Sequence, residues 1–363
     1  MDTVTHAASG VAALLAMPAR PATRWALPCA ALAAVAPDMD ILFAATPLQF
    51  LQLHRGITHS LAAVPLLGLA LTIPARPLWR ENTPGRWSFR KVWLFLCALL
   101  LLHIWLDAVT TYGIMPFLPF SDERIRLNGI FIIDPVLTLP LLWVCFRHRA
   151  GPVPARRALA WAFLYPAFCV VLCAWHCGRV ENRLIAAGRD VSQVTILPDA
   201  FAPFYWRALF VEQSSDGSRV REQGLNVLGR PHILESSFPA ASETLVGRLA
   251  SQSVSCGTFF GFACLPVTTS LPARHLPQDA RPGRAYLLFH DLRFGSALAP
   301  IRRLMEMRPN ADTPFLLMVE LDGDGGRLLR ERLLFADSRL DSGWNAPRRS
   351  AVQGFFHWLA GLR

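Results

Sequence analysis

The first half of the chain places imidazole and carboxylate side chains at spacings that suit a shared ion. His103 and Asp107 are four residues apart in an apolar run, so one face of a helix carries both side chains. His54 and His59 are five residues apart, which is too wide for one helix face and favours a loop that leads into a helix. Nitrogen and oxygen donors without a thiolate are typical of zinc, manganese or iron sites. These spacings therefore indicate metal chemistry.

Further ionisable residues lie in or beside other apolar runs. Asp38 and Asp40 come directly after a predicted helix end, Asp134 precedes Pro135 at the start of another apolar run, and His6 interrupts the first one. Inserting a charged side chain into a bilayer costs about 2.5–3.5 kcal/mol on insertion scales. Such residues are therefore functional candidates by default.

The composition indicates a membrane protein. The 363 residues are 53% hydrophobic and 17% charged, whereas a soluble chain carries about 25% charged residues. The mean hydropathy is +0.32, the net charge is +10 and the pI is about 9.8, with Lys91 as the one lysine. A pI this high raises nucleic acid as a partner. Arginines in short loops between apolar runs instead follow the positive-inside rule, so we expect no nucleic-acid partner.

The apolar runs predict an α-helical transmembrane bundle of about four to six segments within a membrane domain of residues 1–177. The clearest segments are Ile57–Ile73, Val92–Ala108, Ile130–Phe146 and Ala158–Cys177, and two shorter ones precede them, Val4–Met17 and Trp25–Ala36. One set of alternate loops holds eleven basic residues, whereas the opposite set holds three, namely Arg55, Arg124 and Arg126. This asymmetry places the first set in the cytoplasm. We expect a multi-pass protein of a bacterial inner membrane whose residues 178–363 are periplasmic.

The predicted topology brings the polar groups of the bundle into one leaflet. The eight residues on the outer side are His6, Asp38, Asp40, His54, His59, His103, Asp107 and Asp134. Independent helix caps or interfacial anchors would not gather in this way. An ion-coupled transporter or a metal-handling membrane protein would use the same ligands, but transport requires access from both faces, and the cytoplasmic half of the bundle holds almost no polar residues. The constellation favours a metal site.

Residues 178–363 predict a β-rich α+β soluble domain. The expected strands are Phe204–Glu212, Arg219–Leu228, Thr258–Val267, Tyr286–Phe294, Phe315–Leu321 and Arg327–Phe335, and the expected helices are Ala241–Ser251 and Arg349–Leu362. Cys256 and Cys264 lie deep in this domain, and a disulfide between them is a hypothesis if the domain is periplasmic. A further alternative is a membrane-anchored interaction protein whose outer domain binds a partner, while the intramembrane polar groups only hold the helices together.

The polar segments resemble the motifs of a known family. The segments are Pro37-Asp38-Met39-Asp40, His54-Arg55-Gly56-Ile57-Thr58-His59-Ser60, His103-x-x-x-Asp107 and Thr111-Tyr112-Gly113. They are similar to those of the YdjM/YbcI-type membrane-bound metal-dependent hydrolases (the DUF457 family), which are distantly similar to the zinc phospholipase C and P1 nuclease superfamily. The resemblance covers about residues 1–150 and extends to His290-Asp291-Leu292-Arg293-Phe294.

The resemblance implies roles for single residues. The matched ligand positions are His6, Asp38, His59, His103 and Asp107, with His54 and Asp40 as further ligands and Asp134 as a looser match. The second HxxxE motif of the soluble zinc phospholipases is absent. The resemblance therefore favours one or two divalent ions, zinc first, with manganese or iron as alternatives.

The residues and the resemblance together predict a membrane-bound metal-dependent hydrolase, specifically a phosphoesterase. A bound ion would activate water, Asp38 or Asp40 would act as general base, and Arg55 would stabilise charge on the phosphate. An interfacial arginine that contacts lipid head groups is the alternative interpretation of Arg55. A site that opens at the outer leaflet suggests a lipid or lipid-linked phosphoester as substrate, and the oligomeric state stays open.

Overall fold

The chain divides into two compact units. The computed structural model describes residues 1–21, 23–79, 87–147, 151–213, 217–233, 235–306, 314–323, 325–335 and 340–348. The first unit, here called the helical unit, comprises Met1–Ile41, Arg55–Trp175 and Pro198–Tyr205. The second, the β unit, comprises Leu42–His54, His176–Leu197 and Trp206–Arg363. The β unit thus includes a short segment, Leu42–His54, that lies in sequence between two of the polar motifs.

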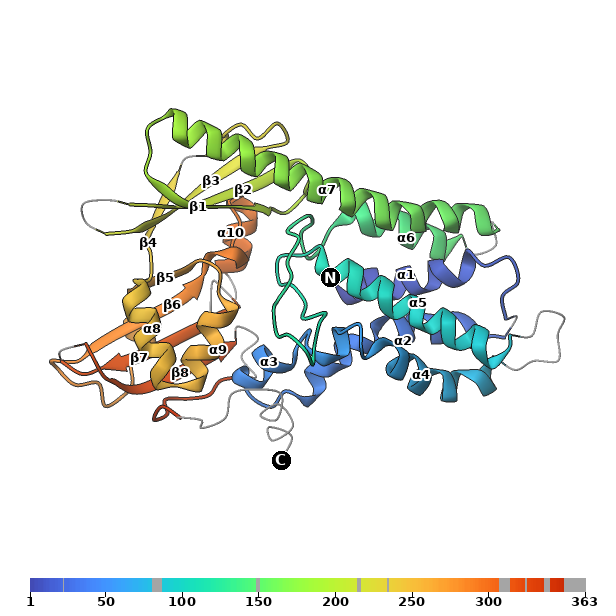
Figure 1. Cartoon of the computed structure of the whole chain (residues 1–363), viewed down its shortest axis with the longest axis horizontal. Helices are drawn as coiled ribbons and strands as arrows, with labels where there is room; N and C mark the ends of the chain where they lie inside the picture. The colour runs from blue at the N-terminus through green and yellow to red at the C-terminus, as the bar shows by residue number, and fades with distance from the viewer. Residues whose placement is uncertain are drawn as a thin grey trace. The chain divides into compact units, whose positions relative to one another are not determined.

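The helical unit is a bundle of apolar helices (Figure 1). Its elements are α1 (Thr3–Leu15), α2 (Ala26–Val35), most of the 3₁₀ segment η1 (Ala36–Phe43), η2 (Ile57–His59), α4 (Val64–Leu78), α5 (Phe89–Ala108), α6 (Pro135–Phe146) and the first part of α7 (Pro152–Ala186). Alanines of α2 pack against leucines and aromatic residues of α1, α4 and α5 to form its core. This packing brings α1, α2 and α5 together around the polar residues.

Three helices among the described residues are long and apolar enough to cross a membrane. They are Ala26–Phe43, which joins α2 and η1, and the helices Phe89–Ala108 and Pro152–Ala186. The bent pair Pro47–His59 and Val64–Pro77 makes a fourth if it is taken as one broken span. The apolar helices α1 and α6 have only 13 and 12 residues. The predicted helical membrane region followed by a β-rich domain is confirmed, with three to four candidate spans.

Helices α1 and α2 approach closely because α1 carries a glycine at the contact. A Cβ atom at Gly10 would lie 2.4 Å from the carbonyl oxygen of Ala30 and 2.6 Å from the Cβ atom of Ala34. Small residues allow this approach, which gives membrane helices van der Waals contact along their backbones. The contact fixes His6, one turn before Gly10, near the C-terminal end of α2.

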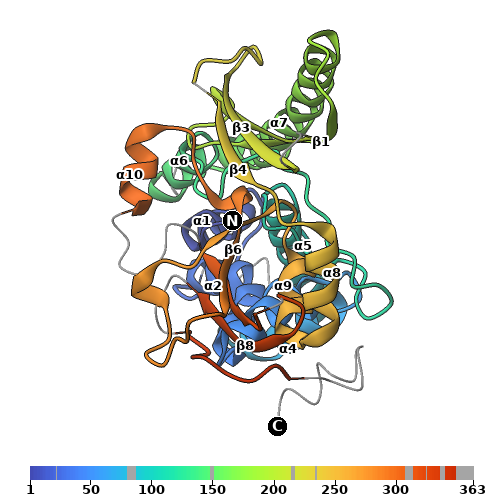
Figure 2. The ribbon, with the colours of Figure 1, turned by 90° about the vertical axis from the view of Figure 1, so that its left-hand side faces the viewer.

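The β unit contains two four-stranded sheets whose strands follow chain order. The first consists of β1 (Val191–Pro198), β2 (Tyr205–Glu212), β3 (Arg219–Asn226) and β4 (Ser236–Pro239), and the second of β5 (Pro266–Ser270), β6 (Ala285–Asp291), β7 (Phe315–Leu321) and β8 (Leu328–Phe335). The pairing is antiparallel between β3 and β4 and throughout the second sheet. The helices are α3 (Pro47–Leu53), α8 (Glu243–Gln252), α9 (Val254–Phe262) and α10 (Ala299–Glu306), and the 3₁₀ segments are η3 (Ala273–His275) and η4 (Leu292–Phe294). Figure 2 shows α8 and α9 beside the second sheet.

Aromatic packing explains why α3 belongs to the β unit. The ring of Phe50 stacks on Phe335 with centroids 4.6 Å apart, and Phe315 lies 5.9 Å away. Gln52 on the same helix donates to the hydroxyl of Thr258 in α9 at 3.4 Å. Offset aromatic pairs contribute about 0.5–1.5 kcal/mol beyond the area they bury. Phe50 therefore anchors a segment of the first half of the chain on the second sheet.

A buried arginine of β2 connects this strand to β3 by an ion pair and to the segment after β6 by hydrogen bonds. Arg207 donates to Glu222 at 2.6 Å and to the carbonyl oxygens of Leu292 and Gly295 at 2.7 and 2.8 Å. A buried guanidinium requires this degree of satisfaction, because an unpaired charge in the interior is costly. Asp291 and Arg293 form a second buried pair at 2.6 Å. The His290-Asp291-Leu292-Arg293-Phe294 motif thus serves the packing of the β unit.

Two sequence expectations for this unit are wrong. Thr258–Val267 is not one strand: α9 runs through Phe262, and β5 begins at Pro266. Cys256 and Cys264 are both free thiols. Cys256 lies in α9, whereas Cys264 follows the end of this helix. The predicted helix Arg349–Leu362 lies outside the described residues.

We expect Gly10→Ala to destabilise the helical unit. The added methyl group meets the backbone of α2, which cannot move away as a side chain could, and overpacking of this kind costs about 1–3 kcal/mol. Gly178→Ala in α7 is the matched control, because a Cβ atom there meets nothing within 4 Å. The thermal midpoint of the detergent-solubilised chain, followed by tryptophan fluorescence, checks the difference. Equal midpoints for the two variants would contradict the close α1–α2 contact.

Candidate metal centre

Four side chains of the helical unit form a candidate metal-binding group. Asp38, His59, His103 and Asp107 each offer one ligand atom, and these atoms all lie within 4.8 Å of one another. Asp38 comes from η1, His59 from the end of η2, and the other two from consecutive turns of α5. Three of the side chains are fully buried, whereas that of Asp38 is 14% exposed. The predicted pairing of His103 with Asp107 on one helix face is what brings α5 into the group.

Hydrogen bonds on the far side of each imidazole ring set the orientation of both histidines. Nδ1 of His103 lies 2.7 Å from the carbonyl oxygen of Ala34. Because a carbonyl oxygen can only accept, this nitrogen carries the proton. Thr58 donates to Asp40 at 3.0 Å, so its oxygen accepts from Nδ1 of His59, also at 3.0 Å. In their neutral form, both rings therefore present the lone pair of Nε2 to the group, which is the usual arrangement of metal-bound histidine.

The two Nε2 atoms face each other within the group. They are 3.0 Å apart in His59 and His103, and Oδ2 of Asp107 lies 3.1 and 3.4 Å from them. Two lone pairs at this distance repel unless a cation or a proton lies between them. Oδ1 of Asp38 lies 3.5 and 3.6 Å from the same nitrogens and is buried without a hydrogen-bond partner in the described part of the chain. The donor set therefore suits a divalent cation of the first transition row.

Three nitrogen groups surround the other oxygen of Asp107. Nη2 of Arg55 lies 3.0 Å from Oδ1, Nε2 of His6 lies 3.2 Å from it, and the amino group of Met1 contacts it as well. The ring of His6 also stacks on that of His103 with centroids 3.8 Å apart. His6 thus borders the group of four through Asp107 and lies outside it.

Asp40 organises the loop that carries His59. One carboxylate oxygen accepts from the backbone nitrogen of Arg55 at 2.9 Å and from the hydroxyl of Thr58 at 3.0 Å. Arg55 has a φ of +58°, which is unfavourable for a residue with a side chain. The hydrogen bond from its backbone to Asp40 supports that conformation. Asp40 lies 3.6 Å from Nδ1 of His59, on the side of the ring away from the group.

The structure does not bring His54 and Asp134 into the group. His54 belongs to the β unit, caps the end of α3 and contacts the ring of Phe50 at 4.9 Å. Asp134 caps the start of α6 with one oxygen, and its other oxygen accepts from the hydroxyl of Tyr165 at 2.8 Å. An aspartate before a proline is also the sequence signature of a helix start, because proline is favoured at the first helical position. The sequence around Asp134 is therefore compatible with a helix cap as well as with a metal ligand, and in the structure Asp134 is a helix cap.

Several contributors to the site escape sequence reasoning. The carbonyl group of Ala34 has no side-chain signature, so its contact with His103 follows only from the packing of α2 on α5. Thr110 accepts from Nη1 of Arg55 at 2.8 Å and fixes the guanidinium beside Asp107. Thr58 lies in the polar motif, but the sequence assigns it no role in the metal centre. The hydroxyl instead links Asp40 to His59.

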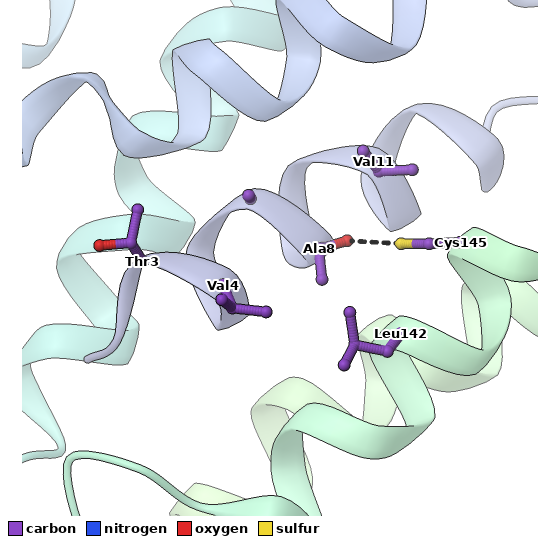
Figure 3. A pocket seen from close by; sticks show the side chains of 7 residues that line it. Thr3, Val4, Ala8, Val11, Leu142 and Cys145 are labelled. Atoms are coloured by element: carbon purple, nitrogen blue, oxygen red, sulfur yellow. Dashed lines mark hydrogen bonds between the residues drawn. The ribbon is translucent and has the colours of Figure 1, made fainter.

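An apolar groove lies on another face of α1. It has a volume of about 340 Å³ and is lined by Thr3, Val4, Ala7, Ala8, Val11, Leu142 and Cys145. Figure 3 shows these side chains between α1 and α6, with the thiol of Cys145 donating to the carbonyl oxygen of Ala8 at 3.6 Å. The same helix therefore carries His6 beside the candidate centre and one wall of an apolar groove.

Comparison with known proteins agrees with the motif analysis. Residues 1–176 match the family model described as YdjM inner membrane protein. The chain is 26% identical over 311 residues to a protein of Bacillus subtilis (strain 168) described as "Uncharacterized protein YfhP". The aligned region covers 82% of this chain and 88% of that protein. No solved structure matches the chain. The resemblance to the YdjM family that the motifs predict is confirmed over residues 1–176, and this match includes every residue of the candidate metal centre.

Asp134 and the centre can be separated experimentally. We expect Asp134→Ala to lower the free energy of unfolding by about 1 kcal/mol, because α6 loses its cap, and to leave the bound metal unchanged. Asp134→Asn keeps an acceptor for the cap and serves as the matched control. Thermal midpoint and metal content, measured on the same preparations, check the two effects. Loss of metal in both variants would show that the carboxylate is a ligand.

Proposed function

Because residues 1–176 belong to the YdjM inner membrane protein family, we propose that this chain is a membrane-bound, metal-dependent hydrolase whose centre is the group Asp38, His59, His103 and Asp107. The observation that supports this proposal most directly is that the Nε2 atoms of His59 and His103 lie 3.0 Å apart. Each of the two rings is held by a hydrogen bond at Nδ1. A pair of histidines with this orientation, next to two carboxylates, is a donor set typical of catalytic metal sites.

The group suits one ion better than two. Its four ligand atoms lie within 4.8 Å of one another, and two nitrogen with two oxygen donors match the preferences of zinc, with manganese or iron as the alternatives. Asp40 holds the loop through Arg55 and Thr58, and this role leaves it outside the ligand set. Arg55 adds a fixed positive charge on Asp107 at 3.0 Å.

Each residue of the site would have a separate role in ester hydrolysis. A bound divalent ion supplies a more acidic water molecule and polarises a phosphoryl oxygen. Of the two predicted general bases, Asp38 is the better placed, because it lies in the ligand group, next to any water molecule that the ion would bind. Asp40 instead accepts two hydrogen bonds from the loop. Arg55 would stabilise the negative charge that develops on the phosphate.

The substrate that fits this placement is a lipid or lipid-linked phosphoester. The centre lies among apolar helices of an inner-membrane family, and the groove of about 340 Å³ on α1 has the apolar lining that an acyl chain requires. The arginine distribution in the loops supports a multi-pass protein with the site in the outer leaflet and residues 178–363 in the periplasm.

Substitution of single ligands tests the proposal. We expect His59→Ala and Asp107→Asn to reduce bound zinc, manganese and iron at least about tenfold while membrane insertion stays intact. His54→Ala is the matched control, because that histidine belongs to the β unit. Elemental analysis of the purified full chain gives metal content, and p-nitrophenyl phosphate and phosphatidic acid test hydrolysis with each metal.

The outcomes separate the functional classes. Metal binding with hydrolysis that both ligand variants lose supports the proposal. Full metal content in both variants contradicts the assigned centre. Metal binding without hydrolysis of any phosphoester contradicts the enzyme and favours metal handling or transport, and absence of bound metal favours an interaction protein.

A further inference from the structure

Three guanidinium groups gather at one turn beside the candidate centre. The Cζ atoms of Arg55 and Arg124 lie 5.0 and 5.3 Å from the ring centroid of Tyr112. Nε of Arg126 donates to the carbonyl oxygen of Tyr112 at 3.4 Å, and Nη1 of Arg124 donates to that of Gly113 at 3.3 Å. Arg55, which is distant in sequence from Arg124 and Arg126, therefore meets them at Tyr112 and Gly113.

The backbone of this turn is shaped to accommodate the arginine side chains. Gly113 has a φ of +82°, and a Cβ atom there would lie 2.4 Å from Cγ of Arg126 and 3.1 Å from Cγ of Arg124. The adjacent residue Ile114 forms an antiparallel bridge with Ile125, which lies between the two arginines in sequence. Glycine is thus required both for the left-handed conformation and for the space that the two side chains occupy.

The turn is joined directly to the metal centre through Arg55. The backbone nitrogen of Met115 donates to the carbonyl oxygen of Arg55 at 3.1 Å, and Nη2 of Arg55 lies 3.0 Å from Asp107. Nε of Arg55 is buried without a hydrogen-bond partner in the part of the chain that the structure describes. A buried donor of a charged group that lacks an acceptor destabilises the fold. An anion bound next to Nε would supply the missing acceptor.

The positions of these arginines in the sequence point the same way. The loops opposite the arginine-rich set hold three basic residues, and these are Arg55, Arg124 and Arg126. They therefore contribute nothing to the positive-inside signal, yet all three meet at Tyr112. The ring face attracts the cations. Asp107 lies 3.0 Å from Arg55, and Arg124 and Arg126 add two further positive charges at the same turn.

We propose that Arg55, Arg124 and Arg126 form a phosphate-binding subsite beside the metal centre. The planar guanidinium group matches a phosphate with two parallel hydrogen bonds, which a lysine cannot provide. Arg124 and Arg126 are half-buried and so remain accessible to a ligand, whereas Arg55 reaches the centre. That the bound phosphate belongs to the substrate rests on the proposed function; the anion site itself does not.

Binding of phosphate to the metal-free protein tests the subsite. The full chain in nonionic detergent, treated with a chelator, is titrated calorimetrically with inorganic phosphate and, separately, with dihexanoyl phosphatidic acid. We expect Arg124→Gln and Arg126→Gln each to weaken binding about tenfold, and the double lysine variant to recover only part of the affinity. Arg147→Gln is the matched control, because Arg147 also lies over an aromatic ring, 5.7 Å from that of Trp143, but outside this cluster.

Each result decides the matter. Binding of both probes that depends on Arg124 and Arg126 supports a phosphate subsite, and binding of the phosphatidic acid alone, with the same dependence, identifies a lipid head group as its source. Wild-type affinity in the double glutamine variant, an equal loss in Arg147→Gln, or no binding of either probe to the wild-type chain overturns the proposal. Thermal midpoints exclude unfolding as the cause, and the lysine variants decide where a glutamine variant does not fold. Since no metal is present, failure of the hydrolase proposal would leave this outcome unchanged.

Discussion

The helical unit depends on one constraint: two imidazole rings that present their Nε2 lone pairs to each other at 3.0 Å among apolar helices. Such an arrangement is unfavourable unless a positive charge offsets it, and it persists only where both rings are held from behind. The carbonyl oxygen of Ala34 holds His103, and the hydroxyl of Thr58 holds His59. These two contacts connect α2, α5 and η2, because each of these elements supplies a ring or the hydrogen-bond partner of a ring.

A second constraint comes from the covalent course of the chain between Asp40 and Arg55. These two residues are hydrogen-bonded to each other in the helical unit, whereas the segment between them, Leu42–His54, belongs to the β unit. Phe50 stacks on Phe335 there. The segment between Asp40 and Arg55 is thus held at its ends by a carboxylate hydrogen bond and at Phe50 by aromatic packing.

The sequence predicts the centre better than its surroundings for a physical reason. A histidine or aspartate within an apolar helix is costly, so its presence carries information, and His59, His103 and Asp107 are found this way. The same residue types at helix ends carry less information, because capping and metal binding both need a carboxylate oxygen. Asp134, for example, caps α6. Backbone acceptors such as Ala34 leave no trace in residue identity. Strand and helix are equally compatible with the short apolar run before Pro266, which is why α9 is missed.

The arginines show how one residue type can carry two signals. Eleven basic residues lie in one set of loops, and the proposed orientation in the membrane depends on their number and not on any particular contact. Arg55, Arg124 and Arg126 lie in the opposite loops, and each has defined partners at Tyr112, Gly113 or Asp107. Residues that act by number can be exchanged for one another, whereas residues that act by geometry cannot. Exchange of arginine for lysine should therefore leave the topology unchanged in the first set and weaken phosphate binding in the second.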